Sequence, residues 1–223
     1  MNKGERWPKT YRSWTAPVAP RPSVIDFVAR RSAAAPYTAR QNRTFLAGAC
    51  NNKERIEYFA YAVANPKLAD AAVRERYKCG ATFPLRKKGL SAAARRAGMV
   101  YAGENHSSWW RHIDYKFAVY EAGNQGAPRL ELQYLLASGS VVLARRFKTV
   151  EHYYHLLQDG VHYKVYDTFD DLRRIQRELL ADEAGAMRIA ANALAFIRSV
   201  RANVTHDALL AVRAHIASAP SER

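Results

Sequence analysis

The sequence has few of the features that mark metal sites, disulfide scaffolds or membrane segments. Its two cysteines, Cys50 and Cys79, form no Cys-x-x-Cys pair, so no structural zinc site is predicted, while a single disulfide stays open. His152 and His155 have helical spacing but no third ligand, which favours packing or surface roles. No apolar run approaches the roughly 20 residues of a membrane span, and no signal-peptide core is visible. We therefore expect no metal and no transmembrane segment.

Acidic residues are scarce in the first half of the chain. Residues 1–113 contain 21 lysines and arginines against 7 acidic residues, whereas residues 114–223 contain 14 against 13, within a net charge of +15. Such an excess attracts anions, such as a nucleotide-sugar, an anionic glycan, a membrane surface or a nucleic acid. In residues 1–35 the scattered prolines favour an irregular, solvated lead-in. The basic residues of 86–96 have no interleaved aromatic rings, so nucleic-acid binding ranks last among the alternatives.

A predicted strand and turn in the middle of the chain give the first indication of function. Lys116–Tyr120 (KFAVY) is a β-prone run. The residues after it tolerate positive φ and let the chain pass close to a ligand; they are Gly123, Asn124 and Gly126. A turn between a strand and a helix is where α/β folds bind phosphate.

A short amphipathic helix and a second strand complete this unit. Pro128 suits a first helical turn. The predicted inward residues have helical spacing: Leu130, Tyr134, Leu135 and Ala137. Ser140–Leu143 is a short apolar strand typical of a parallel sheet. Arg129, in the first turn, offers a planar cation that can bind phosphate through two hydrogen bonds, with a solvated surface arginine as the alternative.

These motifs, in this order, resemble the signature of glycosyltransferase family 90, the family of protein O-glucosyltransferases, fungal capsule xylosyltransferases and lipopolysaccharide-modifying enzymes with a CAP-type domain. The matching residues of the central unit are Lys116-Phe117, Gly123-Asn124, Arg129-Leu130, Leu135-Leu136 and Ser138–Leu143. Flanking matches, which extend the resemblance from about Pro36 to about Arg201, are Arg43–Gly48, Asn65-Pro66, His152–Tyr154, Val161–Tyr163 and Asp171-Leu172.

The resemblance implies an α/β fold, namely the Rossmann-like nucleotide-sugar-binding lobe of a GT-B-type glycosyltransferase, with C-terminal helices. It divides the chain into a basic lead-in or remnant of the first lobe (1–35), the donor-binding lobe (36–203) and a C-terminal helix and tail (204–223). The donor-binding residues that it implies are Arg129, Lys116, Gly123, Asn124, Gly126 and Gly48.

The implied activity is an inverting transfer of glucose or xylose from a UDP-sugar to a hydroxyl of a protein or glycan, with no metal and no cofactor. The catalytic base of the family belongs to the first lobe, so the catalytic residues are not assigned. Asp114 is a candidate by position, against the reading of a surface aspartate at a strand start. Glu131 reads as a first-turn residue that complements the helix dipole. The expected location is the secretory lumen (endoplasmic reticulum or Golgi) for a full-length eukaryotic chain, and the cytoplasm otherwise.

Several departures from the family pattern keep a second reading open. The chain has Ala47, Ala49, Ala122 and Pro128 where the family has arginine, serine, aspartate and serine. Two candidate phosphate contacts are thereby lost. The alternative is a non-catalytic or partial glycosyltransferase-like domain that binds a nucleotide-sugar.

The C-terminal third predicts three helices with buried apolar faces. Thr168 and Asp171 form a capping box for the first, Asp182 caps the second, and Thr205 caps the third. The predicted inward residues are Leu172, Ile175 and Leu179, then Met187, Ala190, Leu194 and Ile197, then Leu209, Val212 and Ile216.

Overall fold

The chain folds around a six-stranded parallel sheet. The computed structural model describes residues 24–48, 53–74, 100–101, 111–121, 131–146 and 154–218, and all structural statements concern these. The strands are β1 (Gln41–Gly48), β2 (Ala69–Arg74), β3 (Val100–Tyr101), β4 (Tyr115–Tyr120), β5 (Val141–Arg145) and β6 (Lys164–Tyr166). Their spatial order is β3-β2-β1-β4-β5-β6, and every pairing is parallel. The predicted Rossmann-like α/β fold is confirmed.

The strand order reverses between β1 and β4. From β1 the sheet grows through β2 to β3, and from β4 it grows through β5 to β6, on the opposite side. Thr44 pairs with Phe117 and Phe45 with Ala118, so the two strands end at the same edge. In open α/β sheets, ligands bind outside the carboxyl ends of the strands at such a reversal point. We call the end of the sheet where the parallel strands finish the carboxyl edge, and the end where they start the amino edge.

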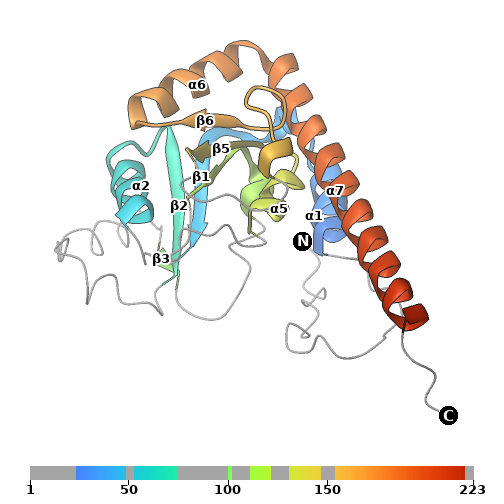
Figure 1. Cartoon of the computed structure of the whole chain (residues 1–223). Helices are drawn as coiled ribbons and strands as arrows, with labels where there is room; N and C mark the ends of the chain where they lie inside the picture. The colour runs from blue at the N-terminus through green and yellow to red at the C-terminus, as the bar shows by residue number, and fades with distance from the viewer. Residues whose placement is uncertain are drawn as a thin grey trace.

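Helices cover both faces of the sheet (Figure 1). They are α1 (Val24–Ala33), α2 (Lys53–Ala64), α5 (Glu131–Leu136), α6 (Phe169–Ala181) and α7 (Glu183–Ser218), with 3-10 turns η1 (Tyr37–Ala39), η2 (Arg111–Asp114) and η3 (Tyr154–Leu156). Helices α2 and α6 pack on one face, and α1 and α5 pack on the other. Helix α7 contributes to both clusters, since its first residues join the α2–α6 side and later ones the α1–α5 side.

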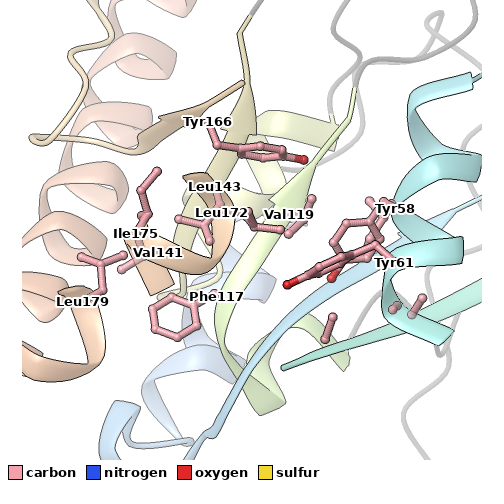
Figure 2. Packing of buried hydrophobic residues seen from close by; sticks show 14 of the residues in the cluster. Tyr58, Tyr61, Phe117, Val119, Val141, Leu143, Tyr166, Leu172, Ile175 and Leu179 are labelled. Atoms are coloured by element: carbon pink, nitrogen blue, oxygen red, sulfur yellow. The ribbon is translucent and has the colours of Figure 1, made fainter. Parts of the chain in front are cut away.

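The larger core lies between the sheet and helices α2 and α6. Figure 2 shows Val119 and Leu143, from neighbouring strands, beside Leu172 of α6. All three side chains are fully buried, and each such burial contributes about 1.5–3 kcal/mol. A second cluster on the opposite face joins Tyr120 and Val142 of the sheet to the helices on that side. The continuous apolar runs of β4 and β5 reflect this burial on both faces.

The two strands and the helix of the central unit form as predicted, with a rotated helix face, while the predicted turn lies outside the described residues. Helix α5 buries its leucines, whereas the predicted inward residue Tyr134 is only half-buried. The buried residues are Leu132, Leu135, Leu136 and Ala137. Leu132 packs with the sheet residues of the second cluster, which sets the orientation of the helix. Gly139, between α5 and β5, has a φ of 69°, a conformation that favours glycine.

Two of the three predicted C-terminal helix starts are correct. The Thr168 hydroxyl accepts a hydrogen bond from the Asp171 amide at 3.1 Å, and the Asp171 carboxylate accepts from the Thr168 amide, which completes the predicted capping box. Asp182 Oδ1 accepts from the Gly185 amide at 2.8 Å and so caps α7. Thr205 begins no helix, because α7 continues through it without a glycine or proline to stop it. Met187 is 45% exposed and not inward, another correction.

The lead-in is more regular than the sequence suggested. Residues 24–33 form helix α1, whose Ile25 and Val28 are buried against the second cluster. The prediction of an irregular segment up to residue 35 is therefore wrong for this stretch. The helix can form because the last proline of residues 1–35 is Pro22, and because Ile25 and Val28 have the spacing of one helix face. The basic residues of 86–96 lie outside the described residues.

Candidate functional site

The carboxyl ends of β1 and β4 are joined by an arginine from α2. Gly48 is the last residue of β1, and the Arg55 guanidinium lies directly over it: a Cβ added at Gly48 would be 2.8 Å from Arg55 Nη1. No side chain larger than hydrogen fits there unless Arg55 moves. The glycine that the sequence singled out thus permits a close approach of a cation to the end of the first strand.

Arg55 also connects the end of β4 to the start of α5. Its Nε and Nη2 donate to the main-chain carbonyl of Glu121 at 3.3 and 3.1 Å, and Nη2 lies 2.8 Å from Glu131 Oε2. The Arg55 and Glu131 side chains are 7% and 12% exposed, so this ion pair is little screened by solvent. Glu131 therefore has a specific partner in addition to its place in the first helical turn.

A second set of polar contacts continues along the same edge to β5 and β6. Glu121 Oε1 accepts hydrogen bonds from Arg145 Nε at 3.0 Å and from the Tyr166 hydroxyl at 2.5 Å. Arg145 Nη1 lies 3.2 Å from Glu57 Oε2 on α2. We call these six residues the carboxyl-edge cluster: Arg55, Glu57, Glu121, Glu131, Arg145 and Tyr166. They tie α2 to the ends of β4, β5 and β6 and to the start of α5.

Burial perturbs the acid groups of this cluster. Desolvation raises the pKa of Glu121, which is 1% exposed, and the charge of Arg145 and the hydroxyl of Tyr166 oppose that rise. Desolvation and the adjacent Glu121 together raise the pKa of Tyr166 well above its ordinary value. The cluster thus holds charges at the carboxyl ends of the strands, where ligands of open α/β sheets bind.

Four predicted donor-binding residues lie outside the described residues, namely Gly123, Asn124, Gly126 and Arg129. The structure does show where their segment starts and ends. It leaves the sheet after Glu121 and enters α5 at Glu131, and Arg55 contacts both of these residues. The described residues that flank 122–130, Glu121 and Glu131, therefore both lie at the carboxyl edge, on the guanidinium that lies over Gly48.

Lys116 is not brought to this edge. It is the second residue of β4, at the amino edge, where its Nζ lies 2.6 Å from Glu183 Oε1 in the first turn of α7 and 5.6 Å from the centre of the Tyr37 ring. This contact holds α7 on the sheet. The donor-binding role of Lys116 stays a prediction, and none of its described contacts supports it.

Asp114 also lies at the amino edge. It ends η2, directly before β4, and burial raises the pKa of its carboxyl while Arg111 and Arg40 oppose that rise. The length of β4 separates it from Gly48, so the described structure does not join it to the carboxyl-edge cluster.

Ala47 is fully buried and packs with Phe45, Ala72 and Tyr115.

Sequence reasoning missed Arg55, Glu121 and Arg145. Signals for them do exist. Arg55 lies in the charged run KERIE that opens the helix after a glycine-ended strand, Glu121 directly follows the buried strand β4, and Arg145 is the last residue of β5. The sequence does not indicate which of these arginines contacts which carboxylate or carbonyl group. Within the described residues, no group of three metal-ligating side chains occurs, and no helix is apolar and long enough to span a membrane.

Solved structures define the class of the fold. HepE from Anabaena, solved in complex with UDP and glucose, superposes with a TM-score of 0.50 at 16% identity, over 86% of this chain and 53% of HepE. The C-terminal domain of the glycosyl transferase LpcC from Francisella tularensis aligns at 13% identity and a TM-score of 0.49, over 77% of this chain and 91% of that domain. The likeness to HepE shows the fold, which is that of one Rossmann-like lobe of a GT-B glycosyltransferase.

The family follows from the sequence. Residues 9–210 match the family model of glycosyl transferase family 90, and the chain belongs to this family. The match begins earlier than the predicted start at Pro36 and extends beyond Arg201. Protein O-glucosyltransferase 2 of Danio rerio is 31% identical over 160 residues, which are 71% of this chain and 29% of that protein. The chain therefore spans less than a third of the length of this relative.

Proposed function

We propose that the chain binds a UDP-sugar and acts in an inverting transfer of glucose or xylose to a hydroxyl of a protein or glycan. Membership of a glycosyltransferase family and the GT-B lobe support the transferase class. One observation carries the donor site: Arg55 contacts Gly48, Glu121 and Glu131, so the end of β1 and both ends of the 122–130 segment meet at one guanidinium. This meeting point is the reversal of the strand order.

The chemistry of the transfer sets what each residue must supply. The departing diphosphate needs its charge neutralised, and two arginines of this edge are the proposed source: Arg129 by direct contact and Arg55 at the end of β1. Gly123, Asn124 and Gly126 would allow the main chain to approach the phosphates. A carboxylate on the acceptor side must take the hydroxyl proton, and we assign no residue of this chain to that role.

Calorimetric titration tests the proposal. UDP, UDP-glucose and UDP-xylose are titrated into the wild-type chain and into Arg129→Ala. Arg146→Ala is the matched control, because Arg146 is an exposed arginine at the same edge that pairs with Asp167 on the surface. We expect micromolar binding that Arg129→Ala loses and Arg146→Ala keeps. No binding by a folded wild-type chain would overturn the donor-site proposal.

A second candidate is a lobe that binds the donor without transferring it. The buried Ala47 favours it, since position 47 itself supplies no cation, whereas the family has arginine there. Release of UDP from UDP-glucose or UDP-xylose, measured with a panel of protein and glycan acceptors, separates the two candidates. Binding without release on any acceptor would favour the non-catalytic lobe, whereas acceptor-dependent release would exclude it.

A further inference from the structure

Glu121 occupies an unusual position in the carboxyl-edge cluster. It is the first residue after β4, its side chain is 1% exposed, and both its main chain and its side chain accept hydrogen bonds. The main-chain carbonyl accepts two hydrogen bonds from Arg55, and the carboxylate accepts one from Arg145 and one from Tyr166. One residue therefore joins two arginines that come from different elements.

A buried carboxylate is costly unless its contacts compensate for the loss of water. Those of Glu121 come from the ends of the next two strands, since Arg145 ends β5 and Tyr166 ends β6. Arg145 is in turn bound to Glu57 of α2, and its guanidinium lies over the rings of Tyr166 and Phe169, at 5.7 and 5.3 Å. The carboxylate is thus held from several sides. In Figure 2 Tyr166 lies at the margin of the main core, near Leu143.

The main-chain contact decides where Arg55 points. Two nitrogens of its guanidinium donate to the same carbonyl, and a planar group held at two atoms can hardly rotate. The remaining nitrogen, Nη1, is the one nearest to Gly48. Any shift of the Glu121 backbone would therefore move the cation at the end of β1.

From this geometry we infer that Glu121 is a positioning residue of the donor site. Its carboxylate, held by Arg145 and Tyr166, fixes the end of β4, and its carbonyl orients Arg55 toward Gly48. The inference rests on the proposed function and deepens it by naming the group that sets the geometry of the anion-binding edge. Misplacement of a binding group by about 1 Å can cost up to about a hundredfold in function. A small displacement of the Arg55 guanidinium is therefore enough to weaken binding.

The test compares UDP affinity in variants that keep the fold. Glu121→Gln keeps the shape and removes the charge, and Tyr166→Phe removes one donor. Arg146→Gln is the matched control for Arg145→Gln, since the two arginines are adjacent and only Arg145 contacts Glu121. We expect Glu121→Gln and Arg145→Gln to weaken UDP binding about tenfold, Tyr166→Phe about threefold, and Arg146→Gln not at all.

A double-mutant cycle separates positioning from general loosening of the fold. If Glu121 acts through Arg55, then Glu121→Gln has little further effect on UDP affinity once Arg55 is replaced by lysine. Independent, additive losses would overturn the inference. Circular dichroism and thermal unfolding show which variants are folded.

Each outcome has one meaning. No UDP binding by the folded wild type overturns the proposed function, and the inference with it. Wild-type binding that a folded Glu121→Gln variant matches overturns the inference alone. If Glu121→Gln does not fold, Tyr166→Phe decides: weaker UDP binding supports the inference, and wild-type affinity overturns it.

Discussion

The two edges of the sheet use similar residues for different purposes. At the amino edge, Asp70 Oδ2 accepts from Arg111 Nη2 at 3.2 Å and from the Tyr115 hydroxyl, and it lies 3.4 Å from Arg43 Nη2. Phe45 and Tyr115 stack there with ring centres 4.5 Å apart. We call these five residues the amino-edge cluster. Like the carboxyl-edge cluster, it pairs a buried carboxylate, here that of Asp70, with arginine side chains.

The two edges differ in what Arg55 faces, because Arg145 at the carboxyl edge also lies over aromatic rings, those of Tyr166 and Phe169. At the amino edge the arginines cover aromatic rings, with Arg43 5.5 Å from the Tyr115 ring centre and Arg111 5.2 Å from that of Phe45. At the carboxyl edge Arg55 is bound to a main-chain carbonyl and faces a glycine. The rings pack against the starts of the strands, whereas the glycine allows a guanidinium to approach the end of a strand, where α/β sheets bind their ligands. We infer that the first cluster stabilises the fold and the second supports binding.

The largest expected effect is that of Arg55→Ala. It leaves Glu131 without this buried partner and the Glu121 carbonyl without two donors, so we expect a loss of about 3–5 kcal/mol of unfolding free energy. UDP binding is also expected to disappear. Urea unfolding and calorimetry measure the two effects. The control is Lys53→Ala on the same helix, because Lys53 is 68% exposed and its surface pair should contribute less than about 1 kcal/mol.

Asp70→Ala should separate stability from binding at the other edge. Its removal deprives Arg111, Tyr115 and the Ala71 amide of an acceptor, which we expect to cost about 2–4 kcal/mol. UDP affinity of the folded fraction should stay at the wild-type value, as measured by calorimetry well below the melting temperature. A tenfold loss of affinity would show that the amino-edge cluster also serves the ligand.

Two glycine substitutions sharpen the comparison with the same chemical change at each edge. Gly48→Ala should push the Arg55 guanidinium aside, weaken UDP binding about tenfold and change stability by only about 1 kcal/mol. Gly139→Ala, before β5 at the amino edge, has a positive φ, and its Cβ would lie 2.1 Å from Ser32 Oγ. It should lower stability by about 1–3 kcal/mol and leave UDP affinity unchanged. The reverse pattern would contradict the assignment of the two edges.

The smallest effect concerns alkaline pH. Burial, together with the hydrogen bond to Asp70, raises the pKa of Tyr115 from 10.0 to about 12. Since the folded-state pKa is raised, the stability that Tyr115 contributes is present in full below pH 10 and is lost as pH rises towards 12. The difference in unfolding free energy between wild type and Tyr115→Phe should therefore shrink across this range. A constant difference would show that the hydroxyl is not held as described.

Local sequence signals predicted local structure well. The β4–α5–β5 unit, the Thr168 capping box and the Asp182 cap depend on residues within a few positions of one another. The apolar face of α5 was misjudged, because its orientation depends on packing with distant elements. The single long helix α7 was divided at Thr205, since a good capping residue does not end a helix that can continue.

The site was predicted less completely than the fold. Gly48 was implied by the resemblance to glycosyltransferase family 90, through the match at Arg43–Gly48. Arg55 and Glu121 are 66 residues apart, and Arg145 and Glu57 are 88 apart, so their pairing depends on the strand order. The resemblance implied that Lys116 binds the donor, although its position as the second residue of β4 places it at the amino edge, beside Glu183.

Hydrogen–deuterium exchange with and without UDP-glucose tests the central claim most directly, because it reads both edges in one experiment. Binding at the reversal point predicts slower exchange in peptides that cover 44–48, 53–57 and 119–121, with no change in 111–116. Protection confined to 111–116, or no protection at the carboxyl edge under conditions where calorimetry shows binding, would contradict it.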